Sequence, residues 1–187
     1  MIISHKHKFI FFKSRKTAGS SIQVALAKHC GEDDIITGHY RDGIDDHSHS
    51  AGLNMDKFWT NHPHPPLNET RKFLGEEIWN SYFKFAFIRN PYEIQVSRYF
   101  WEKKGKTDIM EDCSIEGFRE WLRGGNMLGH DLLHPYIMMN DKIELDYIGR
   151  FENLKHDFKF ICDILNLSKS ELPVKKGGYR DKLHYSE

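Results

Sequence analysis

The sequence has few cysteines, no net charge and no apolar run long enough to cross a membrane. Its three cysteines, Cys30, Cys113 and Cys162, lie far apart without a C-x-x-C pair, which favours reduced thiols in a cytoplasmic protein. The apolar run Phe9–Phe12 is too short for a signal peptide. The 27 Lys and Arg residues balance the 27 Asp and Glu residues, which argues against a nucleic-acid partner. We therefore expect a cytoplasmic protein that binds neither membranes nor nucleic acid.

The 187 residues are predicted to form a single domain, residues 1–187, because this length and the 39% hydrophobic share suffice for one full core. Positive charge is nevertheless concentrated near the N-terminus, where no acidic residue precedes Glu32. The positive side chains of this segment are Lys6, Lys8, Lys13, Arg15, Lys16 and Lys28. This distribution predicts a local anion-binding site in a neutral protein.

Short apolar runs alternate with helical patterns along the chain. Strands are predicted at Phe9–Phe12, at Phe83–Ile88 and across "IELDYIGRF" (143–151), with a helix after each. This alternation predicts an α/β fold with a mainly parallel central sheet, helices on both faces and ligands beyond the carboxyl ends of the strands. Residues 32–70, rich in Gly, Asp, Asn, His and Pro, are predicted to form a long irregular insertion with a short helix near Met55–Trp59.

The stretch "FFKSRKTAGSSIQVAL" (11–26) combines a strand, a short basic loop and a helix. We expect Ser20 or Ser21 to be the N-cap of that helix. The unpaired N–H groups of a helix N-terminus bind phosphate or sulfate, and small residues let the anion approach closely. A nucleotide or sugar kinase would use the same strand, loop and helix. The loop lacks the order G-x-x-x-x-G-K-[ST], however, and therefore differs from the cradle of such a kinase.

A second candidate site follows the strand Phe83–Ile88. Arg89 comes directly after it, Pro91 suits the first turn of a helix, and Ser97 lies two helical turns further on. An arginine at such a position is more often a salt-bridge partner. Its guanidinium fork also suits a phosphate.

Together the two stretches resemble the sulfotransferases that use 3′-phosphoadenosine 5′-phosphosulfate (PAPS), above all the carbohydrate-type, family 2-like bacterial members. "RKTAGSS" resembles their 5′-phosphosulfate loop, and Arg89 with Ser97 resembles their 3′-phosphate motif. "DDIIT", "DYIGRFENL" and "LPVKKGGYRDKLHYSE" extend the resemblance over nearly the whole chain. Relatives commonly have proline where Arg15 stands.

The resemblance implies a P-loop-NTPase-like three-layer fold and transfer of a sulfuryl group to a hydroxyl of a carbohydrate or small-molecule acceptor. PAPS is the implied co-substrate, adenosine 3′,5′-bisphosphate (PAP) the product, and no metal is required. The residues it implies for nucleotide binding are Arg15, Lys16, Thr17, Ala18, Gly19, Ser20, Ser21, Arg89, Ser97, Lys176, Gly177 and Arg180. Lys16 is the expected partner of the leaving oxygen.

A histidine is expected to accept the proton of the acceptor hydroxyl, because histidine titrates near neutrality. The segment His62-Pro63-His64 resembles the H-x-H segment of hexuronic 2-O-sulfotransferases. We predict His64 as the base and His62 as the second candidate. His39, His47 and His49 are further candidates. The acceptor is expected to contact His39, His134 and Tyr136.

The histidines also fit a metal-binding protein. His47, His49, His62 and His64 could ligate zinc, although their H-x-H spacings lack the usual wider pairing and no cysteine joins them. A sulfotransferase fold could, in addition, bind the nucleotide without catalysis.

Overall fold

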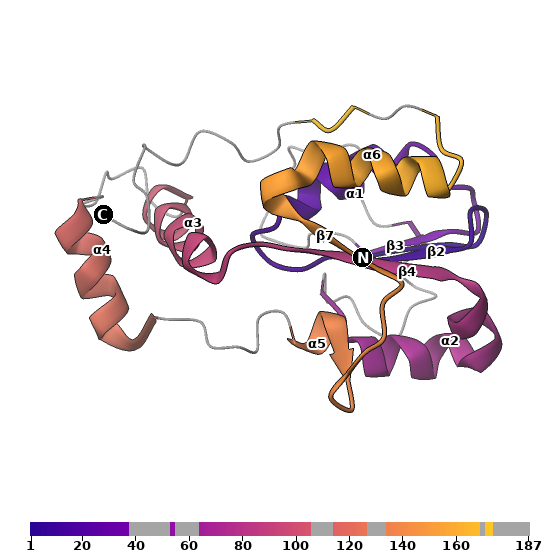
Figure 1. The fold of residues 1–187 in the computed structure, drawn as a ribbon, viewed down its shortest axis with the longest axis horizontal. Helices are drawn as coiled ribbons and strands as arrows, with labels where there is room; N and C mark the ends of the chain where they lie inside the picture. The colour runs from indigo at the N-terminus through magenta and orange to yellow at the C-terminus, as the bar shows by residue number, and fades with distance from the viewer. Residues whose placement is uncertain (38–52, 55–63, 106–113, 127–133, 169–170, 174–187) are drawn as a thin grey trace.

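The computed structural model describes residues 1–37, 53–54, 64–105, 114–126, 134–168 and 171–173. Its main sheet has five strands in the order β3-β1-β2-β4-β7 (Figure 1). The strands are β1 (Ile2–Ser4), β2 (Phe9–Phe12), β3 (Ile35–Ile36), β4 (Phe83–Ile88) and β7 (Tyr147–Arg150).

The sheet is mixed rather than mainly parallel as predicted. β2 pairs with β4 and β4 with β7 in parallel, whereas β1 pairs antiparallel with both β2 and β3. Hence β1 alone runs against the other four strands. Because β2, β4 and β7 are parallel neighbours, their carboxyl ends meet at one edge of the sheet.

Helices cover both faces of the sheet, as predicted. α1 (Gly19–Ala27) and α6 (Leu154–Ile164) lie on one face, and α2 (Leu67–Ser81) and α5 (His134–Ile137) on the other (Figure 1). This explains why β2 is apolar throughout: alternate side chains of a strand point to opposite faces. Phe9 and Phe11 pack with α1 and α6, whereas Ile10 and Phe12 pack with the α2 side.

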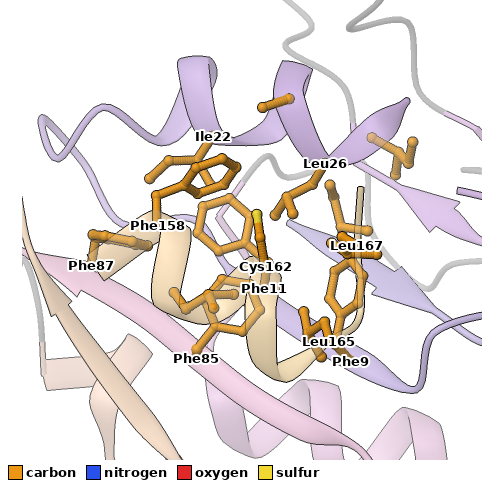
Figure 2. Packing of buried hydrophobic residues seen from close by; sticks show 14 residues of the cluster. Phe9, Phe11, Ile22, Leu26, Phe85, Phe87, Phe158, Cys162, Leu165 and Leu167 are labelled. Carbon is orange, nitrogen blue, oxygen red and sulfur yellow. The ribbon is translucent and has the colours of Figure 1, made fainter. Parts of the chain in front are cut away.

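The core between the sheet, α1 and α6 is rich in phenylalanine. Figure 2 shows Phe9, Phe11, Phe85 and Phe87 of the sheet against side chains of both helices. Gly149 of β7 belongs to this packing, because a Cβ there would lie 2.5 Å from the Phe87 ring. Glycine therefore allows β7 to pair beside Phe87.

The remaining elements lie outside these layers. α3 (Pro91–Gly105) and α4 (Ile115–Trp121), which continues into the π-helical turn η2 (Leu122–Asn126), lie beyond one end of the sheet (Figure 1). Their contact is aromatic, with Tyr99 and Phe100 packed against Trp121. β5 (Met138–Met139) and β6 (Lys142–Ile143) form a separate hairpin, and η4 (Phe151–Asn153) is a 3₁₀ turn after β7.

The predicted strands at Phe9–Phe12 and Phe83–Ile88 are confirmed at those bounds. The predicted strand 143–151 is wrong in extent, since only Tyr147–Arg150 joins the main sheet. Asp146 determines where it begins: its N–H donates to the Lys84 carbonyl (2.8 Å) and its carboxylate accepts from the Lys84 N–H (2.7 Å).

The irregular insertion predicted over 32–70 is only partly irregular among the described residues. Ile35–Ile36 form β3 at the edge of the main sheet, and Ile36 bridges to Leu53. α2 begins at Leu67. The short helix predicted near Met55–Trp59 lies outside the described residues.

Candidate active site

The basic loop between β2 and α1 is fixed to the end of β4. The Ser14 hydroxyl donates to the Phe87 carbonyl and lies 2.8 Å from the Thr17 hydroxyl, and both side chains are buried. Lys16 and Ala18 adopt left-handed backbone angles, with φ 60° and 62°. The loop therefore turns sharply at the carboxyl ends of two parallel strands, where ligands of α/β sheets bind.

The predicted N-cap at Ser20 or Ser21 is wrong. α1 begins at Gly19, its N-cap residue is Ala18, and no side chain caps it. Ser20 and Ser21 lie in its first turn. Because no capping side chain uses the first-turn N–H groups, this end of the helix suits an anion.

Gly19 is required by close packing inside the loop. A Cβ at this position would lie 2.7 Å from Lys13 Cγ and 3.3 Å from the Ser14 carbonyl oxygen. Lys13 cannot readily move aside, because it is only 3% exposed and its Nζ donates to Gln23 Oε1 at 2.9 Å. Gln23 in turn donates to the Thr37 carbonyl at 2.8 Å.

Gly19→Ala is expected to destabilise the protein by about 1–3 kcal/mol, the usual cost of forcing extra volume into a packed site. Alanine favours helices, so propensity alone predicts the opposite sign. Urea unfolding of this variant beside Ser20→Ala, which adds no atoms, measures the cost. A Gly19→Ala protein as stable as wild type would show that the loop adapts easily.

Arg89 joins the loop to the next strand. From the end of β4 its Nη1 donates to the Lys16 carbonyl at 3.1 Å, and its Nη2 lies 3.1 Å from Glu93 Oε2. Its guanidinium carbon lies 4.0 Å from the centre of the Phe151 ring, directly after β7. The salt bridge that is common for an arginine at such a position is therefore present. Three neighbouring strands contribute residues to this site.

Lys16 also contacts α3. Its Nζ lies 5.2 Å from the centre of the Trp101 ring. Ser97, partly buried, lies one helical turn before Trp101 and hence on the same face of α3. This contact shows that the face carrying Ser97 is turned toward the basic loop.

His64 lies beside the same loop, 51 residues away in sequence. Its Nδ1 is 2.5 Å from the Lys13 carbonyl oxygen, which can only accept, so Nδ1 carries a proton and Nε2 is the basic nitrogen of the neutral ring. The Tyr136 ring meets it edge-on, with centroids 6.2 Å apart. Burial, aided by the positive charges of Lys13 and Arg15, lowers the pKa of His64 to about 3, against the opposing effect of the hydrogen bond. His64 is thus neutral at physiological pH.

A family model described as "Sulfotransferase family" matches residues 1–186, nearly the whole chain. The chain belongs to the sulfotransferase family. The predicted family is thereby confirmed, and with it sulfuryl transfer as the general chemistry. An uncharacterised protein of Archaeoglobus fulgidus is 30% identical over 108 residues, which cover 56% of this chain and 84% of that protein.

The sulfotransferase loop could be located from the sequence, but several of its neighbours could not. Lys13 and Gln23 lie beneath it, Phe151 supports Arg89, and Trp101 contacts Lys16. The position of Phe151 carried a usable signal, because it directly follows a predicted strand whose carboxyl end belongs to the ligand edge.

The predicted acceptor contacts are placed in part. Tyr136 is 8% exposed and lies beside His64. Burial raises the pKa of Tyr136, and the charge of Arg15 opposes this shift. The backbone of His134 begins α5.

Other predicted residues lie outside the described part of this sulfotransferase: His39, His47, His49, His62, Lys176, Gly177 and Arg180. Among the residues that the structure does describe, no three His, Cys, Asp or Glu side chains gather as a metal site. Within the same residues, no helix is both long enough and apolar enough to cross a membrane.

Proposed function

We propose that this sulfotransferase moves a sulfuryl group from PAPS to a carbohydrate hydroxyl. The observation that carries the proposal is the hydrogen bond from Arg89 to the Lys16 carbonyl, because it joins the basic loop to Arg89, the two pieces proposed to bind the donor's anionic groups. The acceptor oxygen forms a bond to sulfur while the bond from sulfur to the oxygen of the 5′-phosphate breaks. PAP leaves, and the hydroxyl proton passes to a base.

The proposed donor site extends along that edge. The 5′-phosphosulfate is proposed to lie at residues 15–21, against the first turn of α1. The 3′-phosphate is proposed to lie between Arg89 and the face of α3 that carries Ser97. The Arg89 side chain is 9% exposed and pairs with Glu93, so its fork is oriented before the nucleotide binds. Lys176, Gly177 and Arg180 are proposed to complete the 3′-phosphate site.

Lys16 is proposed to stabilise the negative charge that develops on the leaving oxygen. Fixed positive charge at that atom favours the transition state over the bound substrate, as in phosphoryl transfer. This division of labour requires no metal ion. The proposed role of Lys16 also differs from that of Arg89, because the Arg89 guanidinium is already paired with Glu93.

His64 is proposed as the base. The Lys13 carbonyl accepts from its Nδ1–H, so Nε2 is the nitrogen proposed to take the proton of the acceptor hydroxyl. The low pKa keeps the ring neutral, and the negative charge of a bound donor would raise that pKa toward a useful value. Tyr136, His134 and His39 are proposed to line the acceptor side, with His62 assisting the base. A cytoplasmic location and the P-loop-NTPase-like assignment of the fold stay predictions.

The donor assignment predicts that PAP binds far more tightly than adenosine 5′-monophosphate, since only PAP has a 3′-phosphate. Arg89→Ala should lower the affinity for PAP about 10- to 100-fold, because charge-assisted bonds contribute ~1.5–3 kcal/mol. Ser97→Ala should cost about 2- to 10-fold, as expected of a neutral bond. Isothermal titration calorimetry measures these affinities: those of wild type for the two nucleotides and those of the two variants for PAP.

Arg98→Ala is the matched control. Arg98 lies on α3 and, like Arg89, pairs with the glutamate four residues on, in this case Glu102 (2.6 Å), but it stacks on Trp121 of α4. It should leave PAP affinity unchanged. Equal affinity of wild type for the two nucleotides would refute the 3′-phosphate site.

A further inference from the structure

One contact of the basic loop involves a residue outside the two motifs of the sequence analysis, Trp101. The Lys16 ammonium lies 5.2 Å from the centre of the Trp101 ring, and both side chains are partly buried. Trp101 belongs to α3, whose neighbouring residues Tyr99 and Phe100 are buried against Trp121. The indole is therefore carried by a well-packed part of the helix rather than by a loop.

An indole is a suitable support for an ammonium group that must act on a ligand. A ring attracts the cation through its π-electrons and occupies one side of it, whereas N–H groups on the other sides stay able to donate. It carries no charge, so it does not reduce the field that the ammonium exerts on an anion. The support of Arg89 differs, because its guanidinium pairs with a carboxylate, that of Glu93, at 3.1 Å.

We infer that Trp101 is a positioning residue for Lys16: it holds the ammonium over the basic loop before the donor binds. This inference rests on the proposed function in one respect, namely that Lys16 acts on the leaving oxygen. Lysine has a long flexible stem and loses much rotational freedom when its end is fixed. Trp101 removes part of that freedom in advance, so the ammonium need not be ordered during the reaction. Trp101 itself touches neither donor nor acceptor in this scheme.

The contact can be tested without any ligand. In ¹H–¹³C NMR spectra, protons above an aromatic ring resonate upfield, so the ε-methylene of Lys16 should give a lysine signal shifted upfield. The signal is assigned by its loss in Lys16→Met. It should disappear in Trp101→Leu and persist in Trp121→Phe, a control that changes an indole of α4 packed on Tyr99 of α3. If wild type shows no upfield lysine signal that is lost in Lys16→Met, the inference is overturned.

The role of Trp101 in turnover is tested by kinetics with a double-mutant cycle of Trp101 and Lys16. Trp101→Leu should lower kcat about 3- to 10-fold and change the PAP dissociation constant less than about twofold, as the loss of one cation–π contact implies. Trp101→Phe, which keeps a ring, should recover most of the turnover. In a Lys16→Met background, Trp101→Leu should have no further effect on kcat. A full effect there would show that Trp101 acts independently of Lys16, and would overturn the inference.

The two proposals fail differently. If wild type transfers no sulfuryl group and binds no PAP, the proposed function is wrong, whereas the NMR signal still decides whether Trp101 holds Lys16. If transfer occurs but the cycle is additive, only the role of Trp101 is wrong.

Discussion

Replacing His64 with alanine is expected to lower kcat at least ~10²-fold and to leave PAP affinity unchanged, because a general base contributes ~10²–10⁴-fold to turnover. His64→Asn is the sharper variant. Its side-chain amide can still donate to the Lys13 carbonyl but cannot accept a proton, so it should be as inactive as His64→Ala. His62→Ala should have a milder effect. Steady-state kinetics with calorimetry of PAP binding measure both quantities.

The pH dependence identifies the group. In the protein without bound donor, the pKa of His64 is about 3. The kcat/KM for PAPS, which reports on the free protein, should therefore stay constant through the pH range where an ordinary histidine titrates, near 6.5. It should fall only as the pH approaches 3. The bound donor is negative and raises this pKa, so the acidic limb of kcat should lie at higher pH. Near-normal activity of His64→Asn, with activity lost in His39, His47 or His49 variants, would place the base elsewhere.

His64 should also make stability pH-dependent in the absence of any substrate. Its pKa is about 3 in the folded protein and near 6.5 in the unfolded chain, so between these values only the unfolded chain binds the proton. The free energy of unfolding should therefore decrease as the pH falls through this window. Urea unfolding of His64→Asn should show a weaker decrease, whatever reaction the protein catalyses.

Lys16→Ala is expected to lower kcat about 10²–10³-fold and to weaken PAP binding much less. The reason is that the negative charge on the leaving oxygen is largest in the transition state. Arg15→Ala is the matched control, since Arg15 is the adjacent positive side chain and is exposed. It should change kcat only slightly. Measurements of kcat and of the PAP dissociation constant on both variants separate the roles.

Equal losses in kcat and PAP affinity for Lys16→Ala would identify Lys16 as an ordinary binding residue. Lys16→Arg adds a second criterion. A guanidinium keeps the charge and can still stack on Trp101, but its planar fork differs from the compact ammonium. Partial recovery of turnover is therefore expected, with PAP affinity close to that of wild type.

The sequence was informative for those strands whose own residue pattern reflects their burial. β2 is apolar throughout and β4 is apolar except for Lys84, because both faces of the sheet are covered, so their bounds could be predicted. β1 and β3 were missed because strands of three and two residues contain no periodic pattern. β1 pairs with β2 and with β3, and β3 pairs with β1, so both strands depend on tertiary pairing.

The same distinction applies to the site. The sequence indicated the basic loop, Arg89 and His64 as separate pieces. Their joining depends on pairs distant in sequence, such as Arg89 with the Lys16 carbonyl and His64 with the Lys13 carbonyl. A backbone carbonyl is the same group in every residue type, so a sequence motif cannot indicate such contacts. Trp101 was missed for a related reason, since aromatic residues on a helix are more often part of a core.

The position of Lys13 has a consequence for the order in which substrates bind. Its side chain packs against Gly19 of the basic loop, and its carbonyl oxygen accepts a hydrogen bond from the His64 ring. Under the proposed function, an anion that orders this loop would also act on the ring proposed to take the proton of the acceptor hydroxyl. We therefore propose that the donor binds first and the acceptor second, so that the acceptor is recognised by the complex of the protein with PAPS rather than by the protein alone.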